Sequence, residues 1–388
     1  MKDKKASVIR NPNLRIIFLV TLLAVGGVSS IAPALPLMVK ELHVNASEIG
    51  LLITIFTLPG MILTPVMGIL ADHYGRKTIL VPSLFIFGIA GFLCTFAKSF
   101  EMLVLLRFIQ GIGASSLGSM NVTLIGDIFS GNQRAAAMGY NSGVLSIGTA
   151  SYPAVGGSLA LVGWHYPFLL PLLAIPVGLL VIFRLKNPEP EAPQSLKQYL
   201  KNTWKNINQP KVWALFVINM LVFFIIYGTI LTYFPLHLSK KFEVNTLIIG
   251  LVISSMSVTT AIAASLTGYL TKRYTVRKLL LTAYGIYIFA ICLVPFVNRI
   301  IFIVPIILVA GFCHGIAMPN VQNLMVGMAP LTERAAFMSL NSMVLRTGQT
   351  LGPLFMGVMY SIANTEATFF AASGITLVMF TITYIFIK

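Results

Sequence analysis

The sequence of 388 residues is poor in charge: only 10% of its residues are Asp, Glu, Lys or Arg, and only eleven are acidic. A soluble globular domain uses roughly 25% charged residues, so an ordinary soluble enzyme is excluded. The 27 Lys and Arg give a net charge of +16, but they punctuate long apolar runs, which argues against nucleic acid as a partner. With 57% hydrophobic residues, the chain is expected to be a polytopic membrane protein whose partner is the lipid bilayer.

Cysteine and recognised catalytic motifs are also scarce. Cys94, Cys292 and Cys313 all fall inside apolar stretches, without the spacing of a metal site or a disulfide framework. No P-loop, HExxH motif, Ser/His/Asp constellation or paired-carboxylate cluster is present. We therefore expect a protein that is not an enzyme, that holds no metal or other cofactor, and that ATP does not drive.

Long apolar runs dominate what is present. A helix needs about 20 mostly apolar residues to cross the ~30 Å hydrocarbon core, and twelve stretches satisfy this requirement. None alternates with a period of two, so we predict an all-α membrane protein with twelve transmembrane helices. The stretches are about 15–38, 47–71, 79–97, 102–126, 136–161, 165–184, 211–236, 247–270, 279–297, 300–327, 335–360 and 365–387.

The positive charges predict the orientation of these spans. Twenty Lys and Arg fall in the tails and loops of one side, five fall on the other side, and two lie inside spans. Cytoplasmic loops carry the excess of Lys and Arg, so both termini are expected in the cytoplasm. The expected location is the inner or plasma membrane of the cell, with the chain crossing it many times.

The two halves of the sequence resemble each other. Shifting the sequence by 200 residues aligns 134–157 with 334–357, and 11 of the 24 positions are identical. Six spans per half would give both halves the same orientation, as in transporters built from parallel repeats that rock around a central site. We predict an N-terminal six-helix bundle at 1–190, a cytoplasmic amphipathic linker at 191–210 and a C-terminal six-helix bundle at 211–388. The linker would be a tether or a regulatory element on the lipid surface.

The second span ends in the sequence GILADHYGRK at residues 68–77. Gly75 permits a tight reversal, and the basic pair that follows holds the loop on the cytoplasmic side. This pattern resembles the signature of the major facilitator superfamily, in the loop where that family carries it. The resemblance implies a conformational latch in which Asp72 and Arg76 meet Asp127 at the end of the fourth span. The expected latch residues are Gly68, Asp72, Gly75, Arg76 and Asp127.

The fourth span contains RFIQGIG at residues 107–113, which resembles the second motif of the same superfamily. An arginine embedded in a membrane costs roughly 2.5–3.5 kcal/mol on insertion scales, so Arg107 should face a polar interior. Two interpretations stay open. Arg107 either contacts the substrate or couples transport, or it ties helices together through backbone carbonyls.

The fifth span carries Gly148, Pro153, Gly156 and Gly157 in a pattern that resembles the antiporter motif of the exporting branches of the superfamily. Small residues and proline let a helix bend and pack closely against another helix. Tyr152 stands where the motif has glycine, which is a departure from the pattern. The resemblance covers the whole chain in its plan of spans. It fits best the twelve-span drug:proton antiporter branch, which implies a proton gradient as the energy source.

The acidic residues all lie in tails, in loops or within about a turn of a span end, so the embedded ionisable groups are Arg107, Arg346 and His314. His314 would titrate near neutral pH or hydrogen-bond in a packed core, and Arg346 would contact substrate or pair structurally. Two arginines without a carboxylate suit a lipophilic cation poorly, so we hypothesise neutral or anionic substrates. The candidate substrate-binding or coupling residues are Arg107, Gln110, Asn121, Asn219, Tyr227, His314, Asn341 and Arg346.

The sequence therefore predicts a secondary transporter, with proton-coupled efflux of small amphipathic compounds or drugs as the leading function. It is expected to act as a monomer. An alternative keeps the fold and changes the cargo to a sugar, an organic anion or a lipid-linked metabolite. A third, of another class, is a transporter-like sensor that moves nothing.

Overall fold

The computed structural model describes residues 8–186, 209–328 and 334–387, and all regular secondary structure within these ranges is helical. Ten helical stretches of this described part are long and apolar enough to cross a membrane. Hydrocarbon offers no water to pair backbone N–H and C=O groups, so a spanning segment must satisfy them within itself, as a helix does. The chain is a multi-pass membrane protein, and the predicted all-α class is confirmed.

The first set of helices, here called the N-terminal helices, begins with a capped turn. The Asn11 side chain accepts a hydrogen bond from the Asn13 N–H at 2.9 Å and so satisfies one free donor of the first turn. Gly75 alone separates two long helices, and its φ of +94° is a conformation that other residues rarely adopt. The N-terminal helices are α2 (Pro12–Ser29), the 3-10 turn η1 (Ala32–Ala34), α3 (Leu35–Glu41), α4 (Leu51–Tyr74), α5 (Arg76–Leu93), α6 (Phe100–Ile128), α7 (Gly131–Ala160), the 3-10 segment η3 (Tyr166–Leu173) and α8 (Ala174–Arg184).

The second set, here called the C-terminal helices, repeats this plan with one irregularity. Two short helices are joined by a π-helical segment, a form that occurs mostly as single turns at functional sites. The C-terminal helices are α10 (Pro210–Ile225), the π segment η4 (Ile226–Tyr233), α11 (Phe234–Phe242), α12 (Thr246–Leu270), α13 (Val276–Leu293), α14 (Ile300–Met328) and α15 (Arg334–Phe386).

Two helices depart from a simple span. The backbone of α15 is non-helical at Ala363 and Asn364, which divides this element into segments 334–362 and 365–386. Helix α7 is 30 residues long but rich in small and polar residues, and it is not among the ten apolar stretches. The linker predicted at 191–210 lies outside the described residues, apart from its last two, so the boundaries of the two predicted bundles stay predictions.

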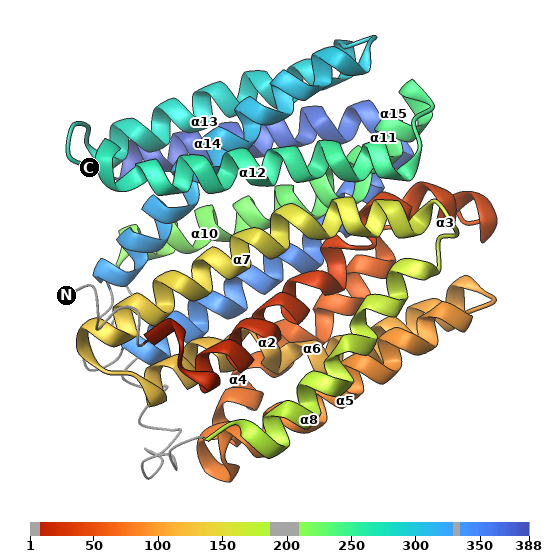
Figure 1. Cartoon of the computed structure of the whole chain (residues 1–388). Helices are drawn as coiled ribbons and strands as arrows, with labels where there is room; N and C mark the ends of the chain where they lie inside the picture. Colours follow the sequence, from red (N-terminus) through yellow and green to blue (C-terminus); the bar gives the residue numbers. More distant parts are fainter. Residues whose placement is uncertain (1–7, 187–208, 329–333, 388) are drawn as a thin grey trace.

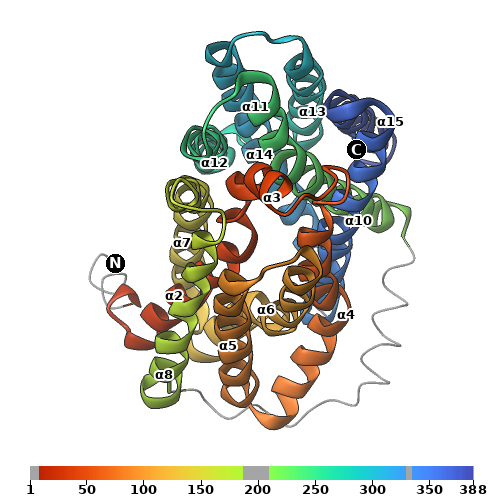
Figure 2. The ribbon, with the colours of Figure 1, turned by 90° about the vertical axis from the view of Figure 1, so that its right-hand side faces the viewer.

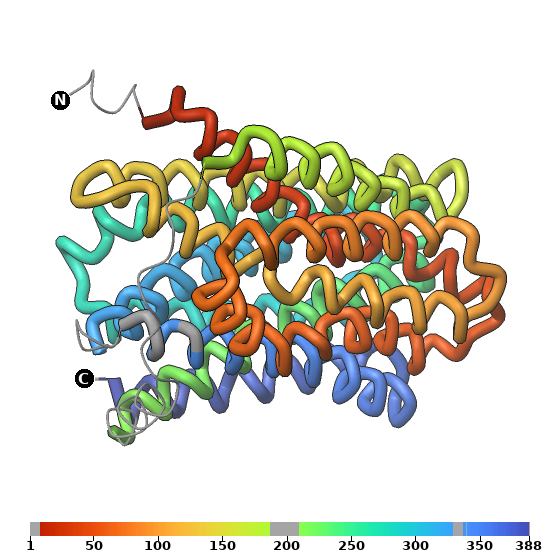
Figure 3. Tube along the Cα trace, turned by 90° about the horizontal axis from the view of Figure 1, so that it is seen from below, coloured from red at the N-terminus to blue at the C-terminus, as the bar shows by residue number. Residues whose placement is uncertain are grey.

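The two sets of helices meet through two helix pairs. Each set packs mainly on itself, while α4 packs on α15 and α7 packs on α12 across the interface. Figure 2, which looks along the helices, shows α7 beside α12 with α4 on the other side of the interface. Helix α2 begins and α15 ends at the same end of the molecule, here called the termini end (Figures 1 and 3). The opposite end, where α3 and α11 lie, is called the far end.

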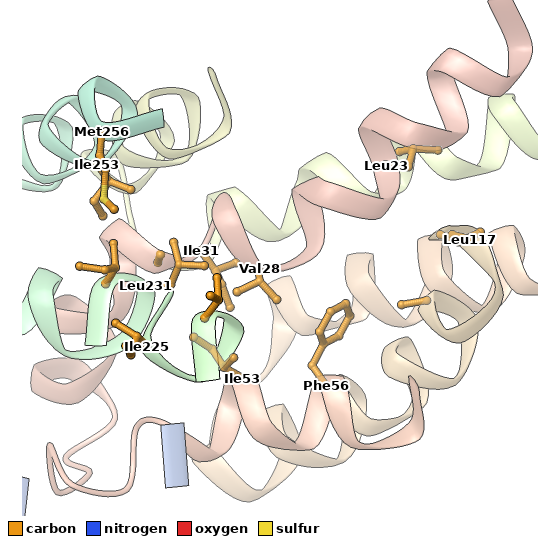
Figure 4. Packing of buried hydrophobic residues seen from close by; sticks show 14 of the residues in the cluster. Leu23, Val28, Ile31, Ile53, Phe56, Leu117, Ile225, Leu231, Ile253 and Met256 are labelled. Carbon is orange, nitrogen blue, oxygen red and sulfur yellow. The ribbon is translucent and has the colours of Figure 1, made fainter. Parts of the chain in front are cut away.

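Apolar side chains from both sets gather where the sets meet. Ile31 follows α2, Ile53 lies on α4, Leu231 lies on η4 and Ile253 lies on α12, and each is at most 7% exposed. Figure 4 shows them converging on one region together with Ile225 of α10. We call these five residues the apolar plug. Close packing of such side chains leaves little room for water between the two sets at this level.

Asn364 provides a test of the kink in α15. Its φ of 62° and ψ of −162° fall in a region that essentially only glycine occupies without strain, which costs on the order of 1–3 kcal/mol for other residues. We expect Asn364→Gly to raise the free energy of unfolding by about 1 kcal/mol. Thermal unfolding of the purified protein in detergent measures this. A lower unfolding temperature for Asn364→Gly than for the unsubstituted protein would contradict this conformation.

Candidate functional site

The pair formed by α4 and α15 closes the far half of the interface through direct backbone and hydroxyl contacts. The Thr54 hydroxyl donates to the Thr350 carbonyl at 2.9 Å, and the Thr350 hydroxyl donates to the Thr57 hydroxyl at 3.0 Å. A Cβ added to Gly50 would lie 2.9 Å from the carbonyl oxygen of Pro353. These contacts allow the two helices to touch along their backbones, as small residues permit in membranes. The three threonines were not among the candidate residues from the sequence, since threonine in an apolar helix carries no distinctive signal.

The pair formed by α7 and α12 closes the opposite side of the interface in the same manner. The Thr246 hydroxyl donates to the carbonyl of Gly157 at 2.8 Å. Gly250 packs against the carbonyl of Pro153, where an added Cβ would collide with the oxygen. Two residues of the antiporter-like motif therefore lie in direct contact with the other set of helices. We call the α4–α15 and α7–α12 contacts together the seam.

The rest of that motif serves packing within the N-terminal helices. Gly156 lies directly against the carbonyl of Ser30, and Gly148 is in contact with Leu22. Helix α7 packs on α2 as well as on α12. The motif residues are thus brought together on one helix, and their role in exchange of substrate and proton stays a prediction.

The two sets part toward the termini end. In the first part of α7, between Gly131 and Gly148, Ala137 is the one buried residue. In the second part, from Gly148 to Ala160, five residues are buried. Helix α4 shows the same change: seven of residues 51–60 are buried, but only Thr64 among residues 61–70. Burial is thus lost along α4 and α7, the two seam helices of the N-terminal set. We call the region between the seam helices on the termini side of the seam the central space.

Arg346 lies where the α4–α15 side of the seam ends. It is carried by α15, but its guanidinium lies against Gly60 of α4, and Nη2 is 3.6 Å from the position of a Cβ on Gly118 of α6. The next glycine along α4, Gly68, has no atom within 4 Å of an added Cβ. The side chain is partly exposed and forms no ion pair with a described carboxylate. A positive charge thus lies at the boundary between the seam and the central space.

Arg107 is placed differently, in the interior of the N-terminal helices. It is fully buried, and its Nη1 donates to the Gly27 carbonyl and to Gln110 Oε1, both at 2.8 Å. Its Nε donates to the Leu52 carbonyl at 3.3 Å, and the Phe56 ring centroid lies 4.0 Å from the guanidinium carbon. The side chain therefore ties α2, α4 and α6 together through backbone carbonyls. Its predicted part in coupling stays a prediction.

Three amide side chains form a closed ring within the C-terminal helices. Asn219 Nδ2 donates to Asn341 Oδ1 at 2.7 Å, Asn341 Nδ2 donates to Gln322 Oε1 at 3.3 Å, and Gln322 Nε2 donates to Asn219 Oδ1 at 3.3 Å. Each amide is both donor and acceptor, which is the arrangement that a buried polar network needs. The ring joins α10, α14 and α15. Gln322 completes the ring, although the sequence singled out only Asn219 and Asn341 as candidates.

His314 and Asn121 are carried by α14 and α6. His314 lines a small pocket of about 20 Å³, together with Tyr284 and Tyr287, and its walls come from α10, η4, α13, α14 and α15. A pocket of this size has room for about one water molecule. Asn121 is 3% exposed on α6, and no described residue donates a hydrogen bond to its Oδ1. The structure therefore distributes the embedded candidates over three places: the interior of the N-terminal helices, the C-terminal helices and the edge of the central space.

The predicted latch residues do meet at the termini end. Arg76 forms an ion pair with Asp72, and its Nε donates to Asp127 Oδ2 at 3.1 Å. The turn at Gly75 points Arg76 back between the ends of α4 and α6. All three charged residues belong to the N-terminal helices, with 50% of the Asp72 side chain and 28% of the Asp127 side chain exposed. The contact exists in this state, and its opening in another state stays a prediction.

Known proteins resemble this chain along nearly its whole length. The sequence profile of the Major Facilitator Superfamily matches residues 17–248 and 217–388. Multidrug resistance protein 1 of Bacillus subtilis (strain 168) is 26% identical over 378 residues, covering 95% of this chain and 96% of that protein. Quinolone resistance protein NorA of Staphylococcus aureus (strain MSSA476) is 28% identical over 377 residues, covering 90% of each chain. Among solved structures, a bacterial homolog of the human lysosomal transporter Spinster has a TM-score of 0.80 at 17% identity, covering 96% of this chain and 97% of that one.

A chain that matches the profile of this superfamily along nearly its whole length is a membrane transporter and not an enzyme. The profile match extends over far more than half of the residues. The chain belongs to the Major Facilitator Superfamily, as its sequence motifs predict.

The seam gives a prediction with opposite signs at two glycines. Gly250→Ala should destabilise the protein by about 1–3 kcal/mol, because the new methyl group meets the Pro153 carbonyl in a packed contact. Gly143→Ala, where an added Cβ meets no atom within 4 Å, should stabilise it by up to about 1 kcal/mol through helix propensity. Thermal unfolding in detergent compares the two. Equal effects of the two substitutions would contradict the seam.

Arg107 gives a second prediction. Arg107→Met should lower the free energy of unfolding by about 1.5–3 kcal/mol, because the charged donors to the Gly27 and Leu52 carbonyls are lost. Arg299→Gln, which removes an exposed positive charge at the far end, serves as the control and should leave stability unchanged. Unchanged stability of Arg107→Met together with lost transport would instead favour a role in coupling.

Proposed function

We propose that this protein is a proton-coupled exporter of small amphipathic compounds that works by alternating access. The observation that carries the proposal is the asymmetry of the interface. The seam and the apolar plug close the far half, while burial is lost along α4 and α7 toward the termini end. A binding site reached from one side only, with the other side closed by contacts that rocking can break, is the geometry that alternating access requires.

In this proposal the chain crosses the cell membrane twelve times, as two six-helix bundles with both termini in the cytoplasm. The ten apolar stretches, together with α7 and the division of α15 at Ala363, support twelve spans. The excess of Lys and Arg in the loops of the termini end supports a cytoplasmic position for that end. The described state would then be open to the cytoplasm, where an exporter takes up its cargo.

A parallel repeat is supported by equivalent contacts in the two sets. The Thr21 hydroxyl donates to Asn141 Oδ1 at 2.6 Å between α2 and α7, and Asn219 Nδ2 donates to Asn341 Oδ1 at 2.7 Å between α10 and α15. Asn141 and Asn341 are separated by 200 residues, the offset of the sequence repeat. The first helix of each proposed bundle is therefore tied to the corresponding asparagine of the fifth helix.

The ion pairs at Arg76 would take part in closing the cytoplasmic side. When the two bundles rock together at the termini end, the exposed Asp72 carboxylate would come to face the other bundle, and Arg76 would hold α4 and α6 in register. Such partly exposed pairs are individually weak, on the order of 0–1 kcal/mol. Weak pairs suit a latch that must open in every cycle.

Export rather than import is supported by the relatives, which are named for multidrug resistance and quinolone resistance. Proton coupling is supported by the antiporter-like motif on α7, whose Gly157 and Pro153 lie in the seam. The described carboxylates lie at the two ends of the helices, so His314 is the candidate for a proton site within the membrane. No further cofactor is needed in this scheme.

Transport into proteoliposomes tests the proposal. A panel of neutral, cationic and anionic fluorescent compounds is offered with an imposed pH gradient, and accumulation is followed by fluorescence. We expect accumulation that disappears when an ionophore collapses the gradient, and that His314→Gln weakens. Accumulation that is indifferent to the gradient would overturn proton coupling, and no transport of any compound would overturn the exporter.

The latch is tested in the same assay. Asp127→Asn removes the acceptor charge of Arg76 and should lower the transport rate by up to about fivefold, the effect of roughly 1 kcal/mol on a barrier. Glu101→Gln removes a carboxylate that is exposed at the far end and should leave the rate unchanged. Equal rates in both variants would contradict the latch.

A further inference from the structure

The guanidinium of Arg346 bridges the two sets of helices at the inner edge of the seam. The side chain starts on α15 and ends against α4, where Gly60 leaves the space that it fills. A Cβ on Gly60 would collide with Nη1. Helix α6 lies beyond, with Gly118 facing Nη2 at 3.6 Å from its Cβ position. Two glycines on two N-terminal helices thus shape the place in which the charge lies.

This charge has no partner among the residues that the structure describes. No described carboxylate pairs with Arg346, and its five N–H donors form no hydrogen bond with a described residue. The described acidic residues occur at the ends of the helices, namely Glu41, Glu48, Asp72, Glu101, Asp127, Glu243 and Glu366. An embedded charge that is neither paired nor bonded to backbone is expected to meet water or a ligand.

Arg107 shows what a structural arginine is like in the same protein. Its guanidinium is fully buried and donates to two backbone carbonyls and to Gln110. Arg346 has an arginine's length and charge, but it is partly exposed and makes none of these bonds. The contrast separates a residue that ties helices together from a residue whose donors have no partner among the described residues.

The helix α10 and the π segment η4 pack against α15, which carries Arg346. The η4 segment carries Tyr227, whose hydroxyl forms no hydrogen bond with a described residue. The Phe223 ring lies 6.3 Å from the Tyr227 ring along the same helix. A planar cation on α15, with aromatic side chains on the neighbouring α10 and η4, suits a compound that carries an anionic head and an apolar body.

We infer that Arg346 binds the carboxylate of anionic amphipathic compounds at the inner edge of the seam. The inference rests on the proposed exporter function and specifies its substrate class. The guanidinium fork matches a carboxylate with two parallel hydrogen bonds, which a lysine ammonium does not reproduce. Since the charge is carried by one set of helices and lies on the other, a bound carboxylate would contact both sets.

The test compares two probes that differ only in charge. Binding of naphthaleneacetate and of its neutral analogue naphthaleneacetamide is measured by calorimetry, on protein in nanodiscs of phosphatidylcholine alone. Anionic lipid headgroups are thereby kept from the guanidinium. We expect the carboxylate to bind at least about tenfold more tightly than the amide, because only the carboxylate is ionised.

The variants assign this preference to one side chain. Arg346→Gln should abolish the preference for the carboxylate while the affinity for the amide changes by less than about twofold, and Arg346→Lys should keep part of the preference. Arg299→Gln, which removes an exposed charge at the far end, should keep all of it. An unchanged affinity for the amide also shows that the Arg346→Gln site is folded.

Three outcomes would overturn the inference: equal binding of the two probes, binding of neither, or a preference that survives Arg346→Gln. The outcome is separate from that of the exporter function, because binding is measured without a pH gradient. Gradient-driven transport of neutral compounds without a carboxylate preference would leave the exporter standing and reject the inference. A carboxylate preference that depends on Arg346, together with transport that is indifferent to the gradient, would support the inference and reject proton-coupled export.

Discussion

Direct contact between glycine and backbone carbonyls at the seam is the constraint on which the rest of this structure depends. Gly250 lies against the Pro153 carbonyl, and the Gly157 carbonyl accepts a hydrogen bond from the Thr246 hydroxyl, so the backbones of α7 and α12 come close together. Inside a membrane, lipid is as apolar as leucine, and close packing of small residues replaces the hydrophobic effect as the force between helices. Contacts of this kind are short in range and carry no charge. They can be broken on one side of the membrane without exposing an unpaired ion.

Three arginines of the chain have three different environments. Arg107 is hydrogen-bonded inside the N-terminal helices, to one carbonyl of α2 and one of α4. Arg76 is paired twice with carboxylates at the termini end. Arg346 alone of these three has no described partner and lies at the edge of the central space. The positive excess of the loops reports orientation in the membrane, and the placement of the embedded arginines is what bears on the cargo.

Much of the fold could be predicted from the sequence because hydropathy and turn chemistry are local. The predicted stretches at 335–360 and 365–387 correspond closely to the two parts of α15, and the GILADHYGRK turn places Gly75 between α4 and α5. The partners of embedded residues could not be predicted in this way. In the sequence, Arg107 and Arg346 look alike, since each is a single arginine in an apolar helix. Only the packing of the helices decides which of them meets backbone carbonyls.

The same limit explains the other residues that the sequence did not single out. Gln322 closes the amide ring with Asn219 and Asn341 only because three helices converge there. Thr54 and Thr350 meet across the two sets of helices, 296 residues apart in the chain. The repeat at an offset of 200 residues gave the best sequence indication of such contacts, because it places Asn141 and Asn341 at matching positions.

Distances between spin labels on the two sets of helices test alternating access most directly. One pair of labels, at Gln133 and Lys272, reports on the termini end, and a second pair, at Lys98 and Asn298, reports on the far end. Pulsed electron resonance is recorded in nanodiscs at two pH values, with and without a transported compound. If the two sets rock about the seam, the distance at the termini end shortens in the same population in which the distance at the far end lengthens. Distances that change in the same direction, or that do not change under any condition, would contradict alternating access by this protein.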